Sequence, residues 1–302
     1  MKKRLFTAVF CLFMVSQISG TEVNRGEVRD KTDAGMVKIN DNGVVFAAGD
    51  YGVRLSKDLC WTIRELTCNG KSLMRDCPGA FNGTVLITWA EEEKKDTWVG
   101  TGHGYEVVES VKLFADGKEQ VIKDGEVYHG NEFRFIKSSD LRVLKLEATT
   151  IINDSGISER HRYTVTKMQP HISELYLFMH SFDVNMTKWL VKTSDDKLLS
   201  GDFTGNSKEP FRGNIQWVSL YNPVGKIGVV YVLTPTLDKT LHFFWDRVHD
   251  RKLYFRGPFE NIRKMKKDDS FEYTVKLVGF ESQEDAWKEK AATIALSHGK
   301  VQ

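Results

Sequence analysis

The sequence predicts an all-β protein, a large antiparallel β-sandwich of two layers with a short helix at its C-terminus. From Val37 onward, short runs of alternating apolar and polar residues are separated by Gly, Asn, Asp and Lys. A period of two residues is that of a half-buried strand. About fifteen such runs follow one another without an internal repeat or a linker, which indicates one large antiparallel domain. Only the end of the chain has helical spacing.

The strand pattern is clearest in residues 141–152. Apolar or small residues occupy every second position from Leu144 to Ile152, and Lys, Glu and Thr stand between them, as in a strand with one buried face. Turn signals separate several runs, at Asp116-Gly117, Asn69-Gly70 and Asp124-Gly125, and the last two are good tight-turn dipeptides. Outside the central region, the predicted strands start near Val44, Cys60, Thr84, Tyr105, Leu141, Ile215, Ile227, Leu241, Lys252 and Phe271.

A helix is predicted near the C-terminus. Ser282 resembles an N-cap because Gln, Glu and Asp follow it, and acidic residues favour the first turn of a helix. Helical spacing and a stop signal then follow in Trp287, Ala291, Ile294 and the dipeptide His298-Gly299.

The N-terminus resembles a secretory signal peptide. Residues 1–20 have three basic residues, an apolar run, and then small and polar residues, a stretch too short to span a bilayer. Residues 21–36 are polar and without pattern, which predicts a flexible leader. We therefore expect a single domain from 37 to 302, in a periplasmic or secreted protein. No later stretch is apolar enough to be a membrane span.

Net charge and cysteine content argue against some partners and sites. The signal peptide holds three of the 43 basic residues and none of the 41 acidic ones, so the remaining chain has a net charge of about −1. Bulk charge of this size does not favour nucleic acid as a partner. Three cysteines remain, and in an oxidising compartment two of them can form a disulfide. These three are Cys60, Cys68 and Cys77, and their spacing does not fit a zinc site.

The stretch 159–182 is the richest in chemically useful groups. It predicts a hairpin of two strands joined by a turn at Gln169-Pro170. On its second strand, one face carries Leu175, Leu177, Met179 and Ser181, and the other carries Glu174, Tyr176, Phe178, His180 and Phe182.

Two interpretations of this hairpin stay open. The aromatic face forms either a second buried layer or the floor of a cleft. If the face is the floor of a cleft, His161 and His180 are candidate catalytic residues, and Arg162 and Tyr176 are candidate substrate-binding residues. A histidine can transfer a proton near neutral pH, and an arginine can stabilise negative charge that develops on a substrate oxygen. The alternative for His180 is a buried neutral ring that bonds to a backbone carbonyl.

Two further regions supply candidates. The glycine-rich loop 98–106 surrounds His103, which either faces a substrate or is solvated in a flexible turn. Most tryptophans of a β-sandwich belong to the core, but Trp98 and Trp245 have ionisable neighbours and are candidate sugar platforms. Asp246, in the charged run after His242, is a candidate catalytic residue at the mouth of a cleft or a solvated turn residue.

The run CWTIRELTCNGKSLM around Asn69-Gly70, followed by a whole chain of antiparallel strands, is similar to the galactose-mutarotase-like supersandwich. The LFMHSF run resembles the strand on which aldose epimerases carry a histidine, but the usual His-x-Tyr-Phe-Asn-Leu run of those enzymes is absent, since Ser181, Phe182 and Asp183 follow His180. This resemblance implies a β-supersandwich of the kind found in aldose epimerases, in polysaccharide lyases and in sugar-binding domains. The fold alone does not choose among these functions.

Three functions are therefore weighed. The first is an exported carbohydrate-active protein that binds or processes a sugar or polysaccharide in a concave groove, with epimerase- or lyase-like proton transfer. The second is a noncatalytic carbohydrate-binding protein, and the third is a structural or partner-binding envelope protein. No cofactor or metal is expected, since nucleotide-binding and zinc-protease motifs are absent from the sequence. The sequence does not determine the oligomeric state.

Overall fold

The structure is a computed structural model that describes residues 34–74, 82–167, 171–206, 209–235, 241–247, 250–257 and 259–299. The predicted signal peptide, most of the predicted leader, Cys77 and the turn at Gln169-Pro170 lie outside these residues. The described residues form 22 strands, which confirms the all-β prediction. Lys31–Gln302 cluster as one compact unit.

The strands form three sheets in which every described pairing between neighbours is antiparallel. Sheet I has six strands in the spatial order β10 (Val127–Gly130), β1 (Gly35–Asn40), β2 (Gly43–Ala48), β3 (Tyr51–Ser56), β4 (Thr62–Cys68) and β5 (Lys71–Ser72). Sheet III also has six, in the order β17 (Arg212–Gly213), β20 (His242–Arg247), β21 (Asp250–Arg256), β14 (Ile172–Ser181), β6 (Gly83–Ala90) and β7 (Lys95–Gly100).

Sheet II is the largest and has ten strands. Their spatial order is β16 (Leu198–Asp202), β15 (Lys188–Thr193), β18 (Ile215–Asn222), β19 (Ile227–Thr234), β22 (Ser270–Glu281), β13 (Gly156–Val165), β12 (Leu144–Asn153), β11 (Phe133–Asp140), β8 (Val107–Ala115) and β9 (Lys118–Gln120). The ten runs that predict strands outside the central region all coincide with observed strands.

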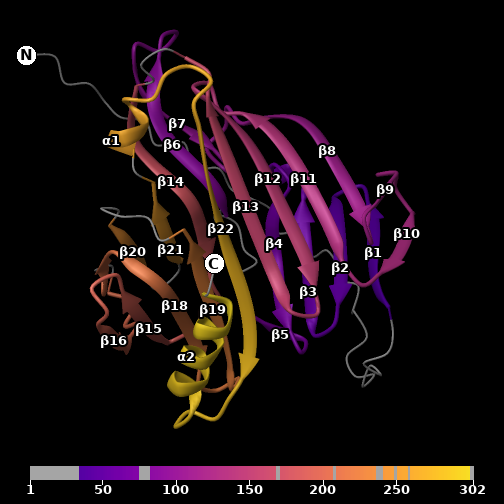
Figure 1. The fold of residues 1–302 in the computed structure, drawn as a ribbon, viewed down its shortest axis with the longest axis vertical. Coiled ribbons are helices and arrows are strands. Elements are labelled where there is room, and N and C mark those ends of the chain that lie inside the picture. Colours follow the sequence, from indigo (N-terminus) through magenta and orange to yellow (C-terminus); the bar gives the residue numbers. More distant parts are fainter. Residues whose placement is uncertain are drawn as a thin grey trace, which may run out of the picture. The chain divides into compact units, whose positions relative to one another are not determined.

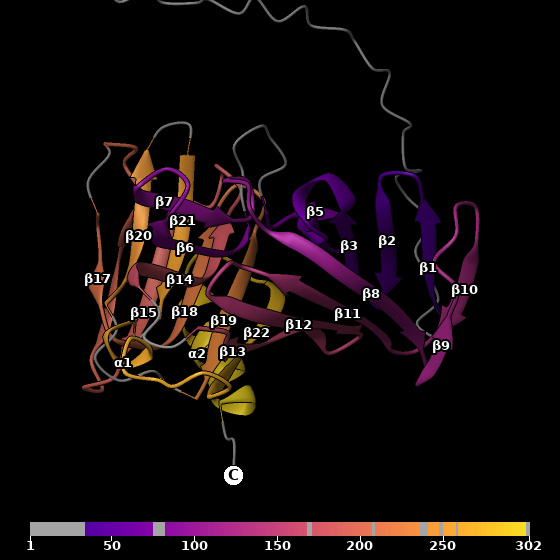
Figure 2. The ribbon, with the colours of Figure 1, turned by 90° about the horizontal axis from the view of Figure 1, so that it is seen from above.

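Sheets I and III lie side by side over one face of sheet II, so the molecule is a two-layer sandwich (Figures 1 and 2). Contacts between aromatic rings join sheet II to each of the two smaller sheets. Phe46 of β2 packs on Phe133 of β11 with ring centroids 5.8 Å apart, and Phe178 of β14 packs on His161 of β13 at 6.0 Å. One continuous apolar core therefore runs beneath both smaller sheets.

The alternation in the sequence gives sheet II its buried face. In β13, Glu159, His161 and Tyr163 are buried, whereas Arg160 and Arg162 between them are exposed. The same alternation holds through the first half of β12. The Asn69-Gly70 turn between β4 and β5 has both residues at positive φ, 51° and 70°, as an Asn-Gly turn requires.

The predicted hairpin across residues 159–182 is wrong. Both strands exist, but β13 pairs with β12 and β22 in sheet II, while β14 pairs with β6 and β21 in sheet III. Both edges of β13 are taken by strands of its own sheet, so β14 crosses to the facing sheet. The two strands meet through their side chains rather than through backbone hydrogen bonds.

The predicted faces of β14 are also wrong, because a β-bulge interrupts the alternation. Tyr176 pairs with Arg256 but Phe178 pairs with Phe255, which leaves Leu177 as an extra residue. The freed carbonyl of Leu177 accepts hydrogen bonds from hydroxyls of both layers, namely Thr84 Oγ1 at 3.0 Å, Tyr163 OH at 2.9 Å and Tyr273 OH.

The bulge changes which side chains share a side of sheet III. Phe178 and His180 face sheet II, where they contact His161 and Tyr231 respectively. Tyr176 and Met179 instead line a groove on the other side of sheet III. A strict period of two would have placed Tyr176 beside His180.

The C-terminal helix α2 (Trp287–His298) covers the face of sheet II opposite the smaller sheets, against β18, β19 and β22 (Figure 1). Trp287 stacks on Tyr221 at 5.0 Å with the rings 3° from parallel. The predicted N-cap at Ser282 is wrong, since Ala286 occupies the cap position without a side-chain bond. The carbonyl of Ser282 accepts the Tyr221 hydroxyl instead, at 2.7 Å. A short helix α1 (Phe259–Ile262) and a 3-10 turn η1 (Lys57–Leu59) complete the described elements.

Cys60 and Cys68 are free thiols, so a disulfide between these two does not form. Burial raises the pKa of the Cys60 thiol to about 11 and that of Cys68 to about 12, which keeps both protonated at neutral pH. Among the residues that the structure describes, no helix has the length and apolar character needed to cross a bilayer.

Candidate functional site

An aromatic groove of about 280 Å³ lies on the face of sheet III turned away from sheet II. Five of its eight lining residues are tryptophan, tyrosine or phenylalanine. The lining comes from four strands and one turn, and consists of Trp98, His103, Tyr176, Met179, Phe243, Trp245, Lys252 and Tyr254. We refer to these residues as the aromatic groove.

Strand alternation explains why these side chains share one face. Phe243 and Trp245 are two residues apart on β20, and Lys252 and Tyr254 are two apart on β21. Phe243 pairs with Tyr254 across the two strands, and Trp245 pairs with Lys252. Side chains two apart on a strand, and those directly opposite on its neighbour, point to the same side of a sheet.

The rings form a continuous wall. Trp98 stacks on Tyr176 with centroids 6.1 Å apart and planes 20° from parallel. Tyr176 meets Tyr254 edge to face at 4.9 Å, and Tyr254 stacks on Phe243 at 4.6 Å. Because Trp98 remains 41% exposed, part of its indole surface is open to a ligand.

Glycines shape the turn that carries His103. Gly102 and Gly104 have φ of 74° and 81°, and the Gly100 N–H donates to the Gly104 carbonyl at 3.0 Å. The turn brings the imidazole over Trp98, with centroids 5.1 Å apart and planes 23° from parallel. Trp98 itself belongs to β7 and not to the predicted loop.

The groove holds two polar groups with shifted pKa values. Burial, together with the positive charge of Lys252, lowers the pKa of His103, so its ring is neutral at pH 7. Burial, together with the negative charge of Glu174, raises the pKa of Tyr176 to about 12, so its hydroxyl keeps its proton. Both side chains therefore act as neutral hydrogen-bonding groups at physiological pH.

Two ion pairs bound the groove. Arg256 binds Glu174 through two hydrogen bonds of 2.8 Å, beside Tyr176. Arg212 binds Glu209 through two bonds of 2.6 Å and lies 4.5 Å above the Phe243 ring. Bidentate pairs of this kind hold the guanidinium planes in fixed positions.

The structure brings together four of the five predicted substrate-binding residues, Trp98, His103, Tyr176 and Trp245. The fifth, Arg162, is exposed on β13 of sheet II, where its Nη2 donates to Ser270 Oγ at 3.5 Å. The sequence interpretation missed four groove residues, Met179, Phe243, Lys252 and Tyr254. The spacing of two on β20 and β21 was a usable signal for the last three. It was no signal for Met179, because the bulge at Leu177 breaks the alternation of β14.

The predicted catalytic His180 lies in the interior between sheets II and III. It is fully buried, and its Nδ1 lies 3.1 Å from the Tyr231 hydroxyl. Its Nε2 has no hydrogen-bond partner among the described residues. Burial lowers the pKa of His180 to about 3, which keeps the ring neutral. The partner is a tyrosine hydroxyl rather than a backbone carbonyl.

His161 belongs to the same interior. Its Nε2 lies 3.2 Å from Glu159, and its Nδ1 lies 3.1 Å from the Tyr273 hydroxyl and 3.3 Å from the Tyr163 hydroxyl. Both histidines border a small cavity of about 20 Å³, a volume that suits a single water-sized molecule and not a sugar ring.

Asp246, the third predicted catalytic residue, anchors a loop. Its buried carboxylate accepts the backbone N–H groups of Thr204 at 2.8 Å and of Gly205 at 2.9 Å. It also pairs with Arg251 at 3.0 Å, and Arg251 donates to the Val184 carbonyl at 2.7 Å. None of the three predicted catalytic residues lines the aromatic groove.

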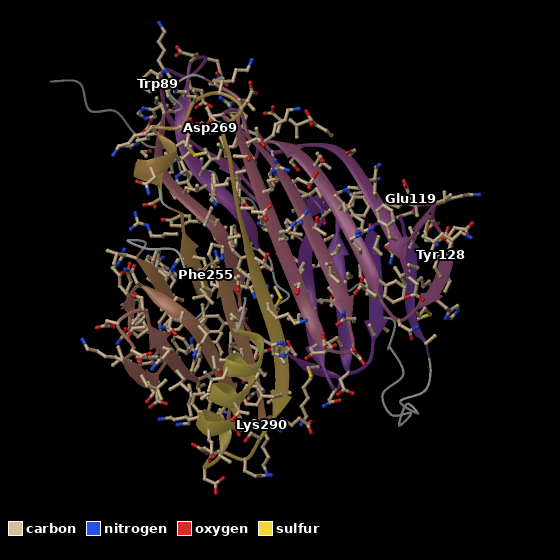
Figure 3. The ribbon with its side chains drawn as sticks, in the orientation of Figure 1. Trp89, Glu119, Tyr128, Phe255, Asp269 and Lys290 are labelled. Atoms are coloured by element: carbon tan, nitrogen blue, oxygen red, sulfur yellow. The ribbon has the colours of Figure 1, made fainter. Side chains whose placement is uncertain are left out.

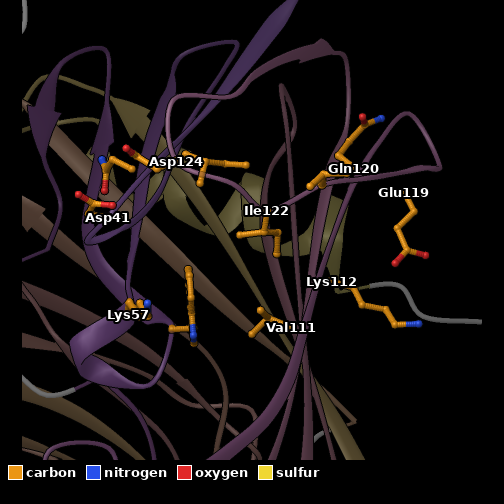
Figure 4. Close-up of a pocket in the computed structure, with 12 residues that line it drawn as sticks. Asp41, Lys57, Val111, Lys112, Glu119, Gln120, Ile122 and Asp124 are labelled. Atoms are coloured by element: carbon orange, nitrogen blue, oxygen red, sulfur yellow. The ribbon is translucent and has the colours of Figure 1, made fainter.

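A second, larger cleft of about 640 Å³ lies where the β1–β2 turn approaches β8 and β9 (Figure 4). Its lining mixes charges of both signs, as in Asp41, Lys57 and Asp124, and contains the single aromatic ring Trp61. Trp61 already packs on Phe135 at 5.4 Å. This cleft lacks the ring platform of the aromatic groove. In the part of the chain that the structure describes, no group of three or more metal-ligating side chains converges.

No protein-family model matches the chain, and no curated protein matches it. Solved structures do resemble it. An α-N-acetylgalactosaminidase of Bifidobacterium bifidum is 9% identical with a TM-score of 0.51, over 85% of this chain and 39% of that one. The GH36 α-galactosidase AgaB of Geobacillus stearothermophilus is 11% identical with a TM-score of 0.50, over 82% and 41%.

The similarity at this level of identity is one of fold. A galactose mutarotase-like protein of Clostridium acetobutylicum also stands among the similar structures, at 12% identity and a TM-score of 0.48, over 83% of this chain and 99% of that one. The resemblance to the two glycosidases concerns the fold alone. It covers about two fifths of each glycosidase and most of the present chain.

Proposed function

We propose that the chain is a carbohydrate-binding protein whose ligand occupies the aromatic groove. The observation that carries the proposal is the convergence of five aromatic side chains around about 280 Å³ on one face of sheet III. Aromatic rings offer a flat apolar surface to the C–H faces of a sugar ring, and tyrosine adds a hydroxyl for hydrogen bonds. Pockets for small ligands combine such apolar walls with a few polar groups.

The polar groups of the groove suit the same ligand. His103 and Tyr176 are neutral at pH 7 and can donate and accept hydrogen bonds from sugar hydroxyls. Trp98 keeps an open ring surface beside them. The fold shared with sugar-processing enzymes agrees with a carbohydrate ligand, although fold alone does not establish it.

Proton-transfer chemistry on the bound sugar, epimerase- or lyase-like, is a second candidate. One observation favours it: His103 lies in the groove with a lowered pKa and can accept a proton at neutral pH. Incubation with reducing sugars, followed by NMR of anomer exchange, tests the epimerase case. Ultraviolet absorption of an unsaturated product from uronate polymers tests the lyase case. A protein that binds sugar but passes neither assay is a noncatalytic binding protein.

Binding is tested by titration calorimetry against neutral hexasaccharides of glucose, galactose, mannose and xylose. The variant Trp98→Ala should lose about tenfold or more in affinity, since truncation of a central aromatic contact commonly costs 2 kcal/mol or so. Trp89→Ala is the matched control. Trp89 is 40% exposed on β6 of the same sheet but does not line the groove (Figure 3). Equal losses in both variants, or no binding by the unmodified protein, would contradict the proposal.

We also propose that the protein is exported, on the basis of the signal-like residues 1–20. Expression of the full chain in a Gram-negative host should give a product in the periplasm or medium that is shorter by the signal peptide. If mass spectrometry finds only the uncleaved chain, and only in the cytoplasm, this assignment is wrong.

A further inference from the structure

A lysine occupies an inward position of strand β11. The inward side chains of this strand include Phe133, Phe135 and Lys137, which alternate with partly exposed residues. The Lys137 side chain is 4% exposed, and its ammonium donates to a Glu106 carboxylate oxygen and to the Cys60 carbonyl, at 2.7 Å each. The Glu106 side chain is 1% exposed. Such an ion pair is costly to remove from water, so it is weak evidence for a role in stability.

The ion pair meets both ends of the turn that carries His103. Glu106 is the last residue before β8, and its second carboxylate oxygen accepts the Thr101 hydroxyl at 3.1 Å. Thr101 is fully buried, and its backbone N–H donates to the Thr84 carbonyl at 3.2 Å. Lys137 therefore links the turn to sheet II, and Thr84 links it to sheet III. We refer to Thr101, Glu106 and Lys137 as the Lys137 cluster.

The residues between the two ends of the turn are exposed. Residues 102–105 all lie at the surface, and two of them are glycines, which restrict the backbone least. Tyr105 packs on the guanidinium of Arg142 at 3.8 Å, a contact at the surface of the protein. The buried attachment of the turn is the Lys137 cluster. The place of the His103 ring over Trp98 therefore depends on how this cluster holds the two ends.

We propose that Glu106 and Lys137 are positioning residues for the aromatic groove, because they fix the turn that holds the His103 ring over Trp98. The inference rests on the proposed carbohydrate binding and adds a buried support for one wall of the groove. It also separates binding from stability. An apolar pair can replace a buried ion pair without loss of stability, but it cannot accept the Thr101 hydroxyl.

The test replaces the ion pair by an apolar pair, Glu106→Leu together with Lys137→Met. This double variant should melt close to the unmodified protein. Calorimetry uses the hexasaccharide of glucose, galactose, mannose or xylose that binds the unmodified protein most tightly. Affinity should fall about threefold, because the ring of His103 loses its fixed place beside the ligand. Unchanged affinity in the folded double variant would show that the pair has no part in binding.

A mutant cycle shows whether the pair acts through His103. In a His103→Ala background, the same double substitution should cause no further loss of affinity, because residues that act together have non-additive effects. A full threefold loss in that background would overturn the positioning role. The control is Lys145→Met with Glu109→Leu, the same substitutions at an exposed ion pair of 3.1 Å between β12 and β8. This control should leave affinity unchanged.

A measurement without sugar separates this inference from the proposed function. Burial, together with the charge of Lys252, lowers the pKa of His103 from 6.5. Release of the ring into water should raise that pKa toward its ordinary value, and NMR titration of the imidazole measures the change in the double variant and the control. An unchanged pKa in the double variant would overturn the inference. A raised pKa in a protein that binds no hexasaccharide would support the positioning role and reject the proposed function.

A single substitution gives the same test if the double variant does not fold. Thr101→Val removes one hydroxyl and keeps the ion pair between Glu106 and Lys137, so no buried charge loses its partner. The pKa of His103 should rise in this variant as well, and sugar affinity should fall. If neither quantity changes, the Lys137 cluster does not position His103.

Discussion

His103 and His180 show how burial separates two similar side chains. Each has a lowered pKa and each stands beside aromatic rings, but His103 faces the open groove and His180 lies sealed between two sheets. A sealed imidazole contributes to packing and hydrogen bonding, while an imidazole in a groove can meet a ligand. The two residues should therefore respond to mutation in opposite ways.

His180→Ala should destabilise the protein by about 1–3 kcal/mol, because it removes a buried ring and leaves the Tyr231 hydroxyl without its partner. Sugar affinity should not change. His103→Ala should instead lower sugar affinity about fivefold and leave the melting temperature nearly constant. Thermal melts and calorimetry of both variants measure the four quantities. A stable His180→Ala protein with weakened sugar binding would show that His180 acts on the ligand.

At the scale of elements, β14 and α2 have the clearest roles. The bulge at Leu177 directs Tyr176 to the groove and Phe178 and His180 to the core, so one strand serves both faces of sheet III. Helix α2 covers the far side of sheet II, where Trp287 anchors a separate apolar cluster. The helix and the groove thus lie on different sheets, and changes in one should leave the other intact.

Trp287→Ala should cost about 3–5 kcal/mol of stability, since Trp287 is 2% exposed and stacks on Tyr221. Leu296→Ala on the same helix is the control, because Leu296 is 65% exposed and its loss should cost less than about 0.5 kcal/mol. Urea unfolding gives both values. Equal stability of the two variants would mean that α2 does not depend on this contact.

For the whole molecule, two buried histidines imply loss of stability in acid. Burial lowers the folded-state pKa of His180 and of His242 to about 3, against an ordinary value of 6.5. Between these values the unfolded chain binds more protons, so stability falls as the pH falls from about 6.5 toward 3 and is fully present above 6.5. Each histidine contributes a slope of up to about 1.4 kcal/mol per pH unit.

Denaturant unfolding at pH 7, 6 and 5 measures this slope. His180→Gln, which is neutral throughout, should be less stable than the unmodified protein at pH 7 but should lose less on acidification. A variant with the same pH slope as the unmodified protein would show that protonation of His180 does not drive the acid loss.

Much of the architecture follows from local pattern. Alternation with period two depends only on the order of apolar and polar residues, so ten strand runs and the all-β class are visible in the sequence. Aromatic and ionisable residues also stand out by type, which explains why Trp98, His103, Tyr176 and Trp245 could be selected before their convergence was known. The helical spacing of Trp287 and Ala291 is local in the same sense.

Strand pairing and burial depend on residues far apart in the chain. The sequence of β13 and β14 predicts a hairpin, but in the structure β13 pairs with β12 and β22, and β14 pairs with β6 and β21. A register shift at Leu177 reverses the faces that alternation predicts. His161, His180 and Asp246 are chemically capable side chains, but a second sheet or a distant loop encloses each of them. Enclosure is a property of packed layers, and no short stretch of sequence contains it.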